Sequence, residues 1–189
     1  MSKVAIAYKG SFSSPLSLVE STIKNHKSMF LDYFEDIDFF FSTYNIGDTQ
    51  LKDLYESRLG KIEWGYIDGS FLTRSTWAAQ FEHHGNLARM IGNRETRYDL
   101  IVITRPDLRW LRSYNVVNID NSKFNIPIQH QSGNCDDNLF VFPQNYLDGF
   151  VKSIDELKSG GGITHALNHR LIENGVPIHY MQEYDESTF

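Results

Sequence analysis

The chain has 189 residues, of which 41% are hydrophobic and 22% charged, a composition that suits one globular domain and excludes a disordered chain. Its formal net charge is −6 without any lysine- or arginine-rich block, which argues against binding to duplex nucleic acid. The single cysteine, Cys135, excludes a disulfide within the chain, and no run approaches the roughly 20 apolar residues of a membrane span. Because no signal-peptide pattern appears either, we expect a soluble, cytoplasmic protein.

Strand-like and helix-like segments alternate along the chain. Runs of β-branched and aromatic residues predict strands at 4–8, 37–41, 62–67, 100–103, 124–128, 139–142 and 176–180. Apolar residues at helical spacing predict helices at 15–34, 48–59, 75–97, 145–157 and 163–174. This alternation predicts an α/β fold in which right-handed βαβ units build a mostly parallel sheet flanked by helices. No repeat or linker interrupts it, so we expect residues 1–189 to form a single domain.

The run 98–110 is the most informative part of the sequence. Its apolar core at 100–103 is typical of a strand buried on both faces, and Pro106 ends regular pairing just beyond it. Arg105 and Asp107 therefore come at the carboxyl end of that strand, where open α/β sheets bind ligands. A cation beside an anion there favours a site for a metal-bound phosphate. A surface ion pair between the two side chains is the alternative.

Two other predicted strands also end in residues suited to a nucleotide. Tyr8, Lys9 and Gly10 end the first strand, where lysine suits a phosphate and glycine lets the backbone approach a ligand. Ser42 and Thr43 follow the second strand, and their hydroxyls suit a base or a ribose. Neither segment is a GxGxxG motif or a P-loop, and an ordinary turn is the alternative for each. In a parallel sheet all these strand ends share one edge with the Arg-Pro-Asp segment.

Carboxylates and histidines form the remaining candidates. Asp136 and Asp137 precede the strand at 139–142, where one suits a general base or a metal contact while the other caps a turn. A solvated acidic turn is the alternative. His165 lies near a predicted helix start, where an anion also binds well. It stands four residues before His169, but Ala166 follows it where a zinc protease motif has glutamate, so we exclude a zinc hydrolase.

Two further features are assigned no function. His83 and His84 lie in the middle of the predicted helix at 75–97, and we expect them on its polar surface. Cys135 has no strongly basic neighbour in the sequence that would favour its thiolate, so it is not a candidate nucleophile.

Taken in order, these landmarks resemble a known family. They are Lys9-Gly-Ser11, the strand Asp38-Phe-Phe-Phe-Ser-Thr43, Arg105-Pro-Asp-Leu108, Asp136-Asp-Asn-Leu-Phe140 and the segment Gly162-Ile-Thr-His-Ala-Leu167. The chain resembles the small GT-A-type glycosyltransferases of polysaccharide loci and large DNA viruses, including chlorella-virus enzymes; a viral member would act in the host cytoplasm. The resemblance covers nearly the whole chain, and Arg-Pro-Asp with the later Asp-Asp is its most specific part.

The resemblance implies transfer of a hexosyl or deoxyhexosyl group from a UDP-sugar or GDP-sugar to a glycan or another hydroxyl acceptor, assisted by Mn²⁺ or Mg²⁺. It implies Asp107 and His165 as metal ligands and Asp137, or Asp136, as the base in an inverting transfer. Arg105 departs from the family's Asp-x-Asp pattern, and as a cation it is suited to contact the diphosphate directly. A nucleotide- or sugar-binding module without transfer activity, or an interaction domain, is the alternative.

Overall fold

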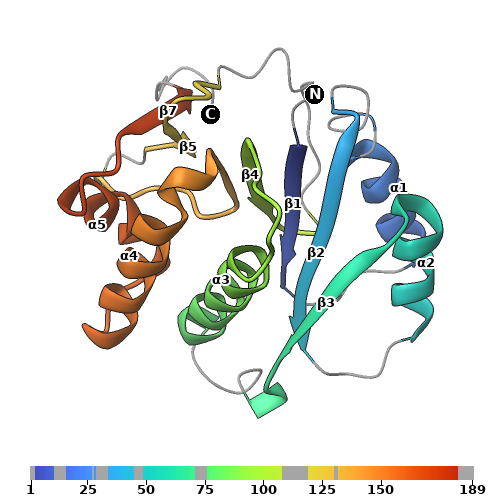
Figure 1. Ribbon diagram of the computed structural model, residues 1–189. Helices are drawn as coiled ribbons and strands as arrows, with labels where there is room; N and C mark the ends of the chain where they lie inside the picture. The colour runs from blue at the N-terminus through green and yellow to red at the C-terminus, as the bar shows by residue number, and fades with distance from the viewer. Residues whose placement is uncertain are drawn as a thin grey trace, which may run out of the picture.

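The computed structural model in Figure 1 describes residues 3–10, 16–26, 28, 34–44, 49–70, 76–107, 119–129 and 132–182. Its strands are β1 (Lys3–Lys9), β2 (Asp36–Tyr44), β3 (Ile62–Ile67), β4 (Leu100–Thr104), β5 (Phe124–Ile128), β6 (Leu139–Phe142) and β7 (Ile178–Gln182). Its helices are α1 (Leu16–His26), α2 (Thr49–Leu59), α3 (Thr76–Gly92), α4 (Leu147–Ser159) and α5 (Leu167–Glu173), and the short 3-10 helices η4 (Gln144–Tyr146) and η5 (Thr164–Ala166).

The strands form one seven-stranded sheet in the order β3-β2-β1-β4-β6-β5-β7. Strands β1 to β4 run parallel, β6 is antiparallel to both of its neighbours, and β7 runs parallel to β5. The chain winds outward from β1 to β3 and then returns to β4 on the other side of β1. Ligands in such sheets bind at the carboxyl ends of the strands beside this reversal, which here are the ends of β1 and β4.

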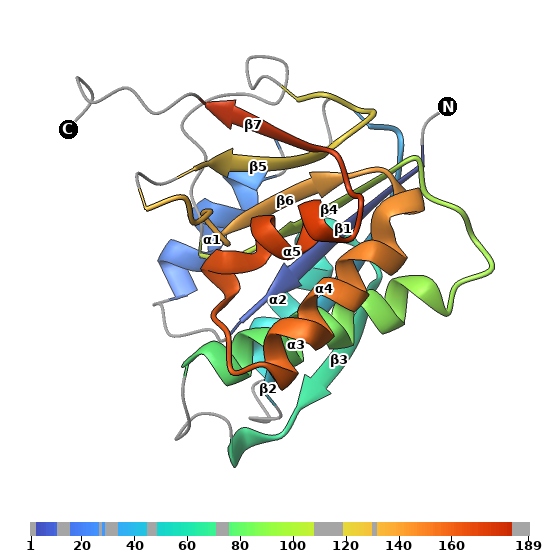
Figure 2. The same ribbon diagram turned by 90° about the vertical axis from the view of Figure 1, so that its left-hand side faces the viewer.

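Helices cover both faces of the sheet (Figures 1 and 2). Alternate residues of β1 serve different layers, because successive side chains of a strand point to opposite faces. Ala5 and Ala7 pack in the core under α3, α4 and α5, whereas Ile6 and Tyr8 pack in the core under α1 and α2. The α/β class, the mostly parallel sheet and the flanking helices predicted from the sequence are therefore confirmed.

Several boundaries differ from those predicted. Strand β2 continues to Tyr44, so Ser42 and Thr43 belong to the strand and not to the loop after it. Helix α1 ends at His26, eight residues before the predicted end; of residues 27–33, only 28 lies within the described part of the chain. Each of the last two predicted helices starts as a 3-10 turn before its α-helix begins. Helix α3 runs without a break through Gly85.

The prediction that His83 and His84 lie on a polar helix surface is wrong. Their exposed fractions are 3% and 0%, because α3 turns this side toward the sheet. The His84 ring packs against Phe140 and Phe150 at centroid distances of 5.6 Å. Both histidines therefore belong to the buried layer between α3 and the strands.

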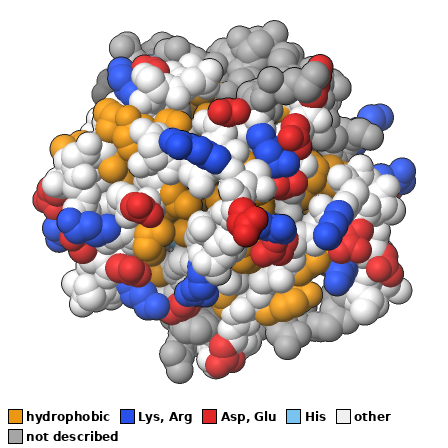
Figure 3. Space-filling model, viewed as in Figure 1, with side chains coloured by type: hydrophobic (Ala, Val, Ile, Leu, Met, Phe, Trp, Pro, Cys, Tyr) orange, Lys and Arg blue, Asp and Glu red, His pale blue; other side chains and the backbone are white. Residues whose placement is uncertain are grey.

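The exterior agrees with the sequence composition. On the face drawn in Figure 3, lysine and arginine side chains lie scattered among aspartate and glutamate, and they form no continuous basic patch. Among the described residues, no helix has both the length and the apolar character needed to cross a membrane.

Candidate active site at the β1–β4 edge

Four segments of the chain meet beside the carboxyl ends of β1 and β4. Lys9 ends β1, Arg105 and Asp107 follow β4, and η5 lies close by. Because β6 is antiparallel to β4, with Leu139 paired to Thr104, the start of β6 lies next to the end of β4. Sheet pairing thus brings the Asp136–Asn138 segment to the same edge as the Arg-Pro-Asp segment, a position that the sequence analysis did not predict.

Arg105 and Asp107 are joined by two hydrogen bonds. The guanidinium Nε lies 2.9 Å from Asp107 Oδ1, and Nη2 lies 2.6 Å from Oδ2. Arg105 Nη1 also donates to Asn138 Oδ1 at 3.3 Å, which connects the β4 end to the start of β6. Partial burial opposes ionisation of Asp107, but the hydrogen bonds and charge of Arg105 hold the pKa of this carboxyl below its usual value. Both side chains keep more than a third of their surface exposed, so an anion can still reach the guanidinium.

Lys9 is buried, whereas a lysine that contacts a phosphate at the surface needs an exposed ammonium. Its exposed fraction is 3%, and its Nζ donates to the backbone carbonyl of Asp137 at 2.6 Å. The ammonium also lies over the Phe140 ring, 5.9 Å from the centroid. Burial lowers the pKa of Lys9 to about 8, although the charge of Asp137 opposes this shift. The lysine therefore faces the loop before β6 and not solvent.

Asp136 and Asp137 have separate roles, as their adjacent positions suggested. Asp136 Oδ1 accepts a hydrogen bond from the Asn138 backbone N–H at 2.9 Å and so closes a turn. Asp137 is 4% exposed, and its Oδ2 lies 2.5 Å from the Thr164 hydroxyl. Its Oδ1 lies 3.7 Å from His165 Nε2. Asp137 is thus the carboxylate held against η5.

Two residues of α3 that the sequence analysis did not single out complete this corner. The rings of Trp77 and His165 meet edge to face at a centroid distance of 4.9 Å. Gln80 Oε1 lies 2.8 Å from the Thr164 hydroxyl that also contacts Asp137. Trp77 and Gln80 stand three apart and share one side of α3. The sequence offered one indication of this role: Trp77 and Gln80 stand three residues apart near the start of the predicted helix at 75–97, which follows the predicted strand at 62–67.

The Ser42 hydroxyl makes its hydrogen bonds inside the protein and is not exposed at the carboxyl ends of the strands. Its Oγ lies 3.0 Å from His83 Nδ1 and accepts a hydrogen bond from Asn86 Nδ2 at 3.0 Å. Burial, helped by the charge of Lys9, lowers the pKa of His83 to about 4.

The other predicted nucleotide contacts divide between edge and core. Gly10 lies at the edge with φ of 121°, a conformation that favours glycine, and its N–H donates to the Ser42 carbonyl at 3.1 Å. Tyr8 is 1% exposed, and its ring stacks on His26 at 5.5 Å on the opposite side of the sheet. Thr43 is 4% exposed, and its Oγ1 is buried without a hydrogen-bond partner in the described part of the chain. The structure therefore gathers Lys9, Gly10, Arg105, Asp107, Asp136, Asp137 and His165, and it places the side chains of Tyr8, Ser42 and Thr43 in the interior.

The protein side chains at this edge fit a divalent ion only if the phosphates of a bound ligand complete its coordination. Within the described segments, no set of three or more His, Cys, Asp or Glu side chains is close enough to enclose a metal. Asp107 binds Arg105 with both oxygens, yet an ionised carboxylate has about four acceptor positions, which leaves room for a metal contact. Magnesium commonly binds through one or two carboxylates together with substrate phosphates. The residues present thus suit an ion that arrives with a phosphorylated ligand.

Comparison with known proteins defines the fold class. No family model and no curated protein sequence matches the chain. Solved structures do match: a nucleotide-diphospho-sugar transferase of Desulfovibrio desulfuricans, described as putative, aligns over 97% of this chain and 81% of its own, with a TM-score of 0.60 and 12% identity. The Mn/GDP form of core-mannan synthase A from Aspergillus fumigatus aligns over 95% and 73%, with a TM-score of 0.56 and 9% identity.

The same fold also appears in a protein named for a different product. The 4-diphosphocytidyl-2C-methyl-D-erythritol synthase of Anaerococcus prevotii aligns over 98% of this chain and 88% of its own, with a TM-score of 0.56 and 11% identity. Identities this low establish the fold alone. The chain therefore has the GT-A-type fold of nucleotide-diphospho-sugar transferases, and its chemistry must be argued from its own residues.

Proposed function

We propose that this protein is a single-domain glycosyltransferase that moves a sugar from a nucleoside-diphosphate sugar to a hydroxyl group of a glycan or another acceptor. One observation carries the proposal: the exposed guanidinium of Arg105 and the anchored carboxylate of Asp137 lie at the same β1–β4 edge, joined through neighbouring residues of one short loop. A cation for the leaving group and a base for the acceptor are the two groups that such a transfer requires.

Arg105 is the proposed contact for the donor diphosphate. Hydrogen bonds to Asp107 and Asn138 hold its guanidinium, so the orientation of this group is set before a ligand binds. Negative charge on the diphosphate grows as the bond to the sugar breaks, and a preorganised guanidinium stabilises that growing charge. Gly10, which has a φ of 121° and carries no side chain, lets the phosphates approach the strand end.

Asp107 and His165 are the proposed ligands of a Mn²⁺ or Mg²⁺ ion, with the donor phosphates completing its coordination. Such an ion, when bound, supplies Lewis-acid stabilisation of the leaving diphosphate. The Mn/GDP form of core-mannan synthase A, which shares the fold, supports this part of the proposal. UDP-sugars and GDP-sugars are the proposed donors.

Asp137 is the proposed general base of an inverting transfer. Its carboxylate is placed by Thr164 and stands beside His165, so one oxygen is fixed while the other faces the imidazole. It takes the proton from the acceptor hydroxyl as that oxygen attacks the sugar. Asp136 is the weaker candidate because its Oδ1 is used to close the turn at Asn138.

A donor-binding module without transfer activity is the second candidate. It is favoured by the 4% exposure of Asp137, since a base must be reached by the acceptor that it serves. Both the transferase and the binding module require donor binding at Arg105, so only a measurement of sugar transfer distinguishes them.

The test is a thermal-shift screen of UDP-, GDP-, CMP- and dTDP-sugars with and without Mn²⁺, followed by mass spectrometry of glycosylated acceptors with any donor that binds. We expect stabilisation by a nucleoside-diphosphate sugar and loss of that shift in Arg105→Gln. Arg58→Gln is the matched control, because Arg58 forms a similarly exposed ion pair with Glu20 away from this edge. Binding without any transferred sugar would favour the binding module, and absence of binding would refute both.

A further inference from the structure

Lys9 is a buried cation in a part of the sheet where an apolar residue would fit. It continues the row of Ala5 and Ala7 on the face that packs under α3, and it pairs in register with Ser42 of β2. An ammonium in such a place is costly to bury unless its hydrogen bonds compensate for lost water. Only the Asp137 carbonyl accepts a hydrogen bond from it among the described residues.

The charged and titratable groups around this ammonium come from three elements. They are His83 and His84 from α3, Arg105 from the end of β4, and Cys135, Asp136 and Asp137 from the segment before β6. Arg105 disfavours a further positive charge and burial keeps the two histidines neutral, so the acidic segment is the one of these three that favours the ammonium. A residue kept at such a cost is expected to serve the site.

The hydrogen bond of Lys9 reaches the same residue that Thr164 and His165 contact. The carbonyl of Asp137 binds Lys9, and its carboxylate binds Thr164, so Asp137 is held between β1 and η5. Movement of its main chain would also move the carboxylate. A displacement of about 1 Å in such a group can reduce turnover about a hundredfold.

We propose that Lys9 is a positioning residue, which sets the place of the Asp137 carboxylate through its main-chain carbonyl and does not contact the donor phosphates. This inference rests on the proposed function, and it changes the role that the sequence suggested for Lys9. The ammonium is enclosed by Phe140 and the segment before β6, whereas the exposed cation at this edge is Arg105.

The proposal separates stability from activity. Replacing Lys9 with methionine removes an ammonium whose charge burial disfavours, which is a gain in stability. The Asp137 carbonyl loses its donor, which offsets part of that gain. Lys9→Met is therefore expected to fold with a melting temperature close to or above that of the wild type, while the Asp137 segment is less well held.

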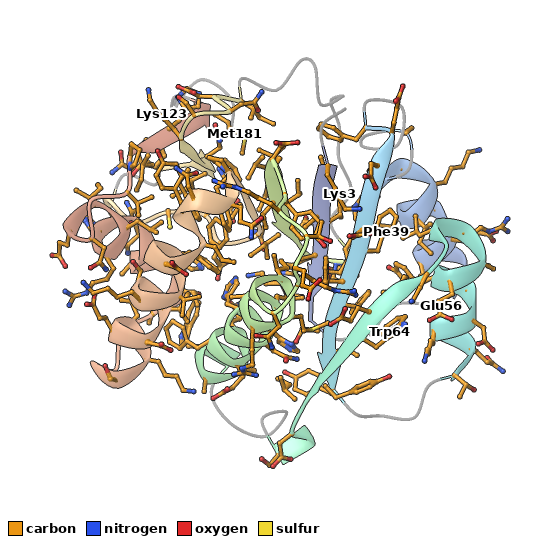
Figure 4. All side chains as sticks on the ribbon, in the orientation of Figure 1. Lys3, Phe39, Glu56, Trp64, Lys123 and Met181 are labelled. Atoms are coloured by element: carbon orange, nitrogen blue, oxygen red, sulfur yellow. The ribbon has the colours of Figure 1, made fainter. Side chains whose placement is uncertain are left out.

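Lys3 provides a matched control at the other end of β1. It lies at the upper part of the sheet in Figure 4, where its Nζ pairs with Asp36 at 3.0 Å on the surface. Lys3→Met removes the same group from the same strand, far along β1 from the proposed site. It is expected to lower the melting temperature slightly and to leave donor binding and turnover unchanged.

The experiment compares wild type, Lys9→Met, Lys3→Met, Asp137→Asn and the double variant Lys9→Met/Asp137→Asn in the full chain. We expect Lys9→Met to keep donor affinity within about threefold and to lose at least about tenfold in kcat. The double variant is expected to lose no more than Asp137→Asn alone, because Lys9 acts through Asp137. Lost donor affinity with unchanged kcat, additive losses in the double variant, or failure of Lys9→Met to fold would each overturn the proposal.

Hydrogen exchange gives a readout that does not depend on turnover. Amides of the segment 135–139 are expected to exchange faster in Lys9→Met and at the wild-type rate in Lys3→Met. If the wild type turns over no sugar donor, the proposed function fails, and exchange still decides whether Lys9 holds this segment. Unchanged exchange in Lys9→Met would overturn the positioning role whatever the enzyme assays show.

Discussion

Arg105 and Asp107 form a two-pronged ion pair at the end of β4, with Nε 2.9 Å from Oδ1 and Nη2 2.6 Å from Oδ2. The sequence left a ligand site and an ion pair as alternatives for these two residues. The structure establishes the ion pair, but its exposure keeps the guanidinium available to an anion. The pair orients Arg105 without hiding it, so the existence of the ion pair does not exclude a ligand site.

Asp107→Asn tests the proposed metal ligand. The change removes the negative charge that attracts a divalent ion and weakens the hold on Arg105. We expect donor affinity in the presence of Mn²⁺ to fall about tenfold, and the difference between affinities measured with and without Mn²⁺ to shrink. Calorimetric titration measures both. Asp120→Asn, which alters a surface pair with Lys123, is the control and should bind donor normally. Wild-type affinity in Asp107→Asn with Mn²⁺ present would contradict the assignment.

Asp137→Asn tests the proposed base. The amide keeps the shape of the carboxylate but cannot take a proton, so donor binding should be retained while kcat falls by about 10²- to 10⁴-fold. Initial rates at saturating donor measure the effect. Asp136→Asn is the matched comparison on the adjacent residue, and we expect a much smaller loss. Equal losses in the two variants, or normal turnover in Asp137→Asn, would show that the base lies elsewhere.

Burial of His83 predicts acid sensitivity. Its pKa in the folded chain is lowered to about 4 from the usual 6.5, so between these pH values the unfolded chain binds a proton that the folded chain does not. The free energy of unfolding is therefore unaffected by this group above pH 6.5 and falls by up to about 3 kcal/mol as the pH drops to 4.

Urea unfolding at pH 7.0, 5.5 and 4.5 measures this loss. His83→Gln should show a shallower fall than the wild type, whereas His169→Gln, a change at an exposed helix position, should follow the wild type. Identical pH dependence in His83→Gln and the wild type would mean that this histidine is not buried in its neutral form.

Two glycines make opposite predictions for the same substitution. A Cβ on Gly65 would overlap Met90 Sδ and stand 2.6 Å from Asn86 Nδ2, so alanine must displace the side chain that donates to Ser42. We expect Gly65→Ala to destabilise the protein by about 1–3 kcal/mol. Gly85 lies inside α3 with nothing within 4 Å of its Cβ position, so Gly85→Ala should stabilise by about 0.5–1 kcal/mol. Chemical denaturation measures both, and equal effects would contradict this account of α3.

The fold was predictable because its strands are strongly marked. The run Leu100–Thr104 is buried along its whole length, as its continuous apolar pattern indicated. The pattern also placed Arg105 and Asp107 correctly beyond the strand end. This segment lies near Asp137 because β6 runs antiparallel to β4, so that the start of β6 is beside the end of β4. Local sequence does not determine the direction in which β6 runs.

Residues in the buried layer were less predictable. Ser42 reads as a loop hydroxyl because polar residues usually end strands, yet β2 extends two residues beyond it and α3 supplies its partners. His83 reads as a surface residue because helix periodicity alone does not tell which side meets the sheet. Lys9 belongs to the same layer, and its partner is distant in sequence. Each of these contacts joins residues that are distant in sequence, so no local sequence pattern predicts it.

The central claim is that this sheet edge binds a nucleoside-diphosphate sugar through Arg105, and calorimetric titration of wild type, Arg105→Gln and Arg58→Gln with UDP- and GDP-sugars in the presence of Mn²⁺ tests it most directly. The account predicts that at least one of these donors binds the wild type, that Arg58→Gln binds it equally well, and that Arg105→Gln binds it at least about tenfold more weakly. Equal affinity in Arg105→Gln, or no binding of any such donor to the wild type, would contradict it.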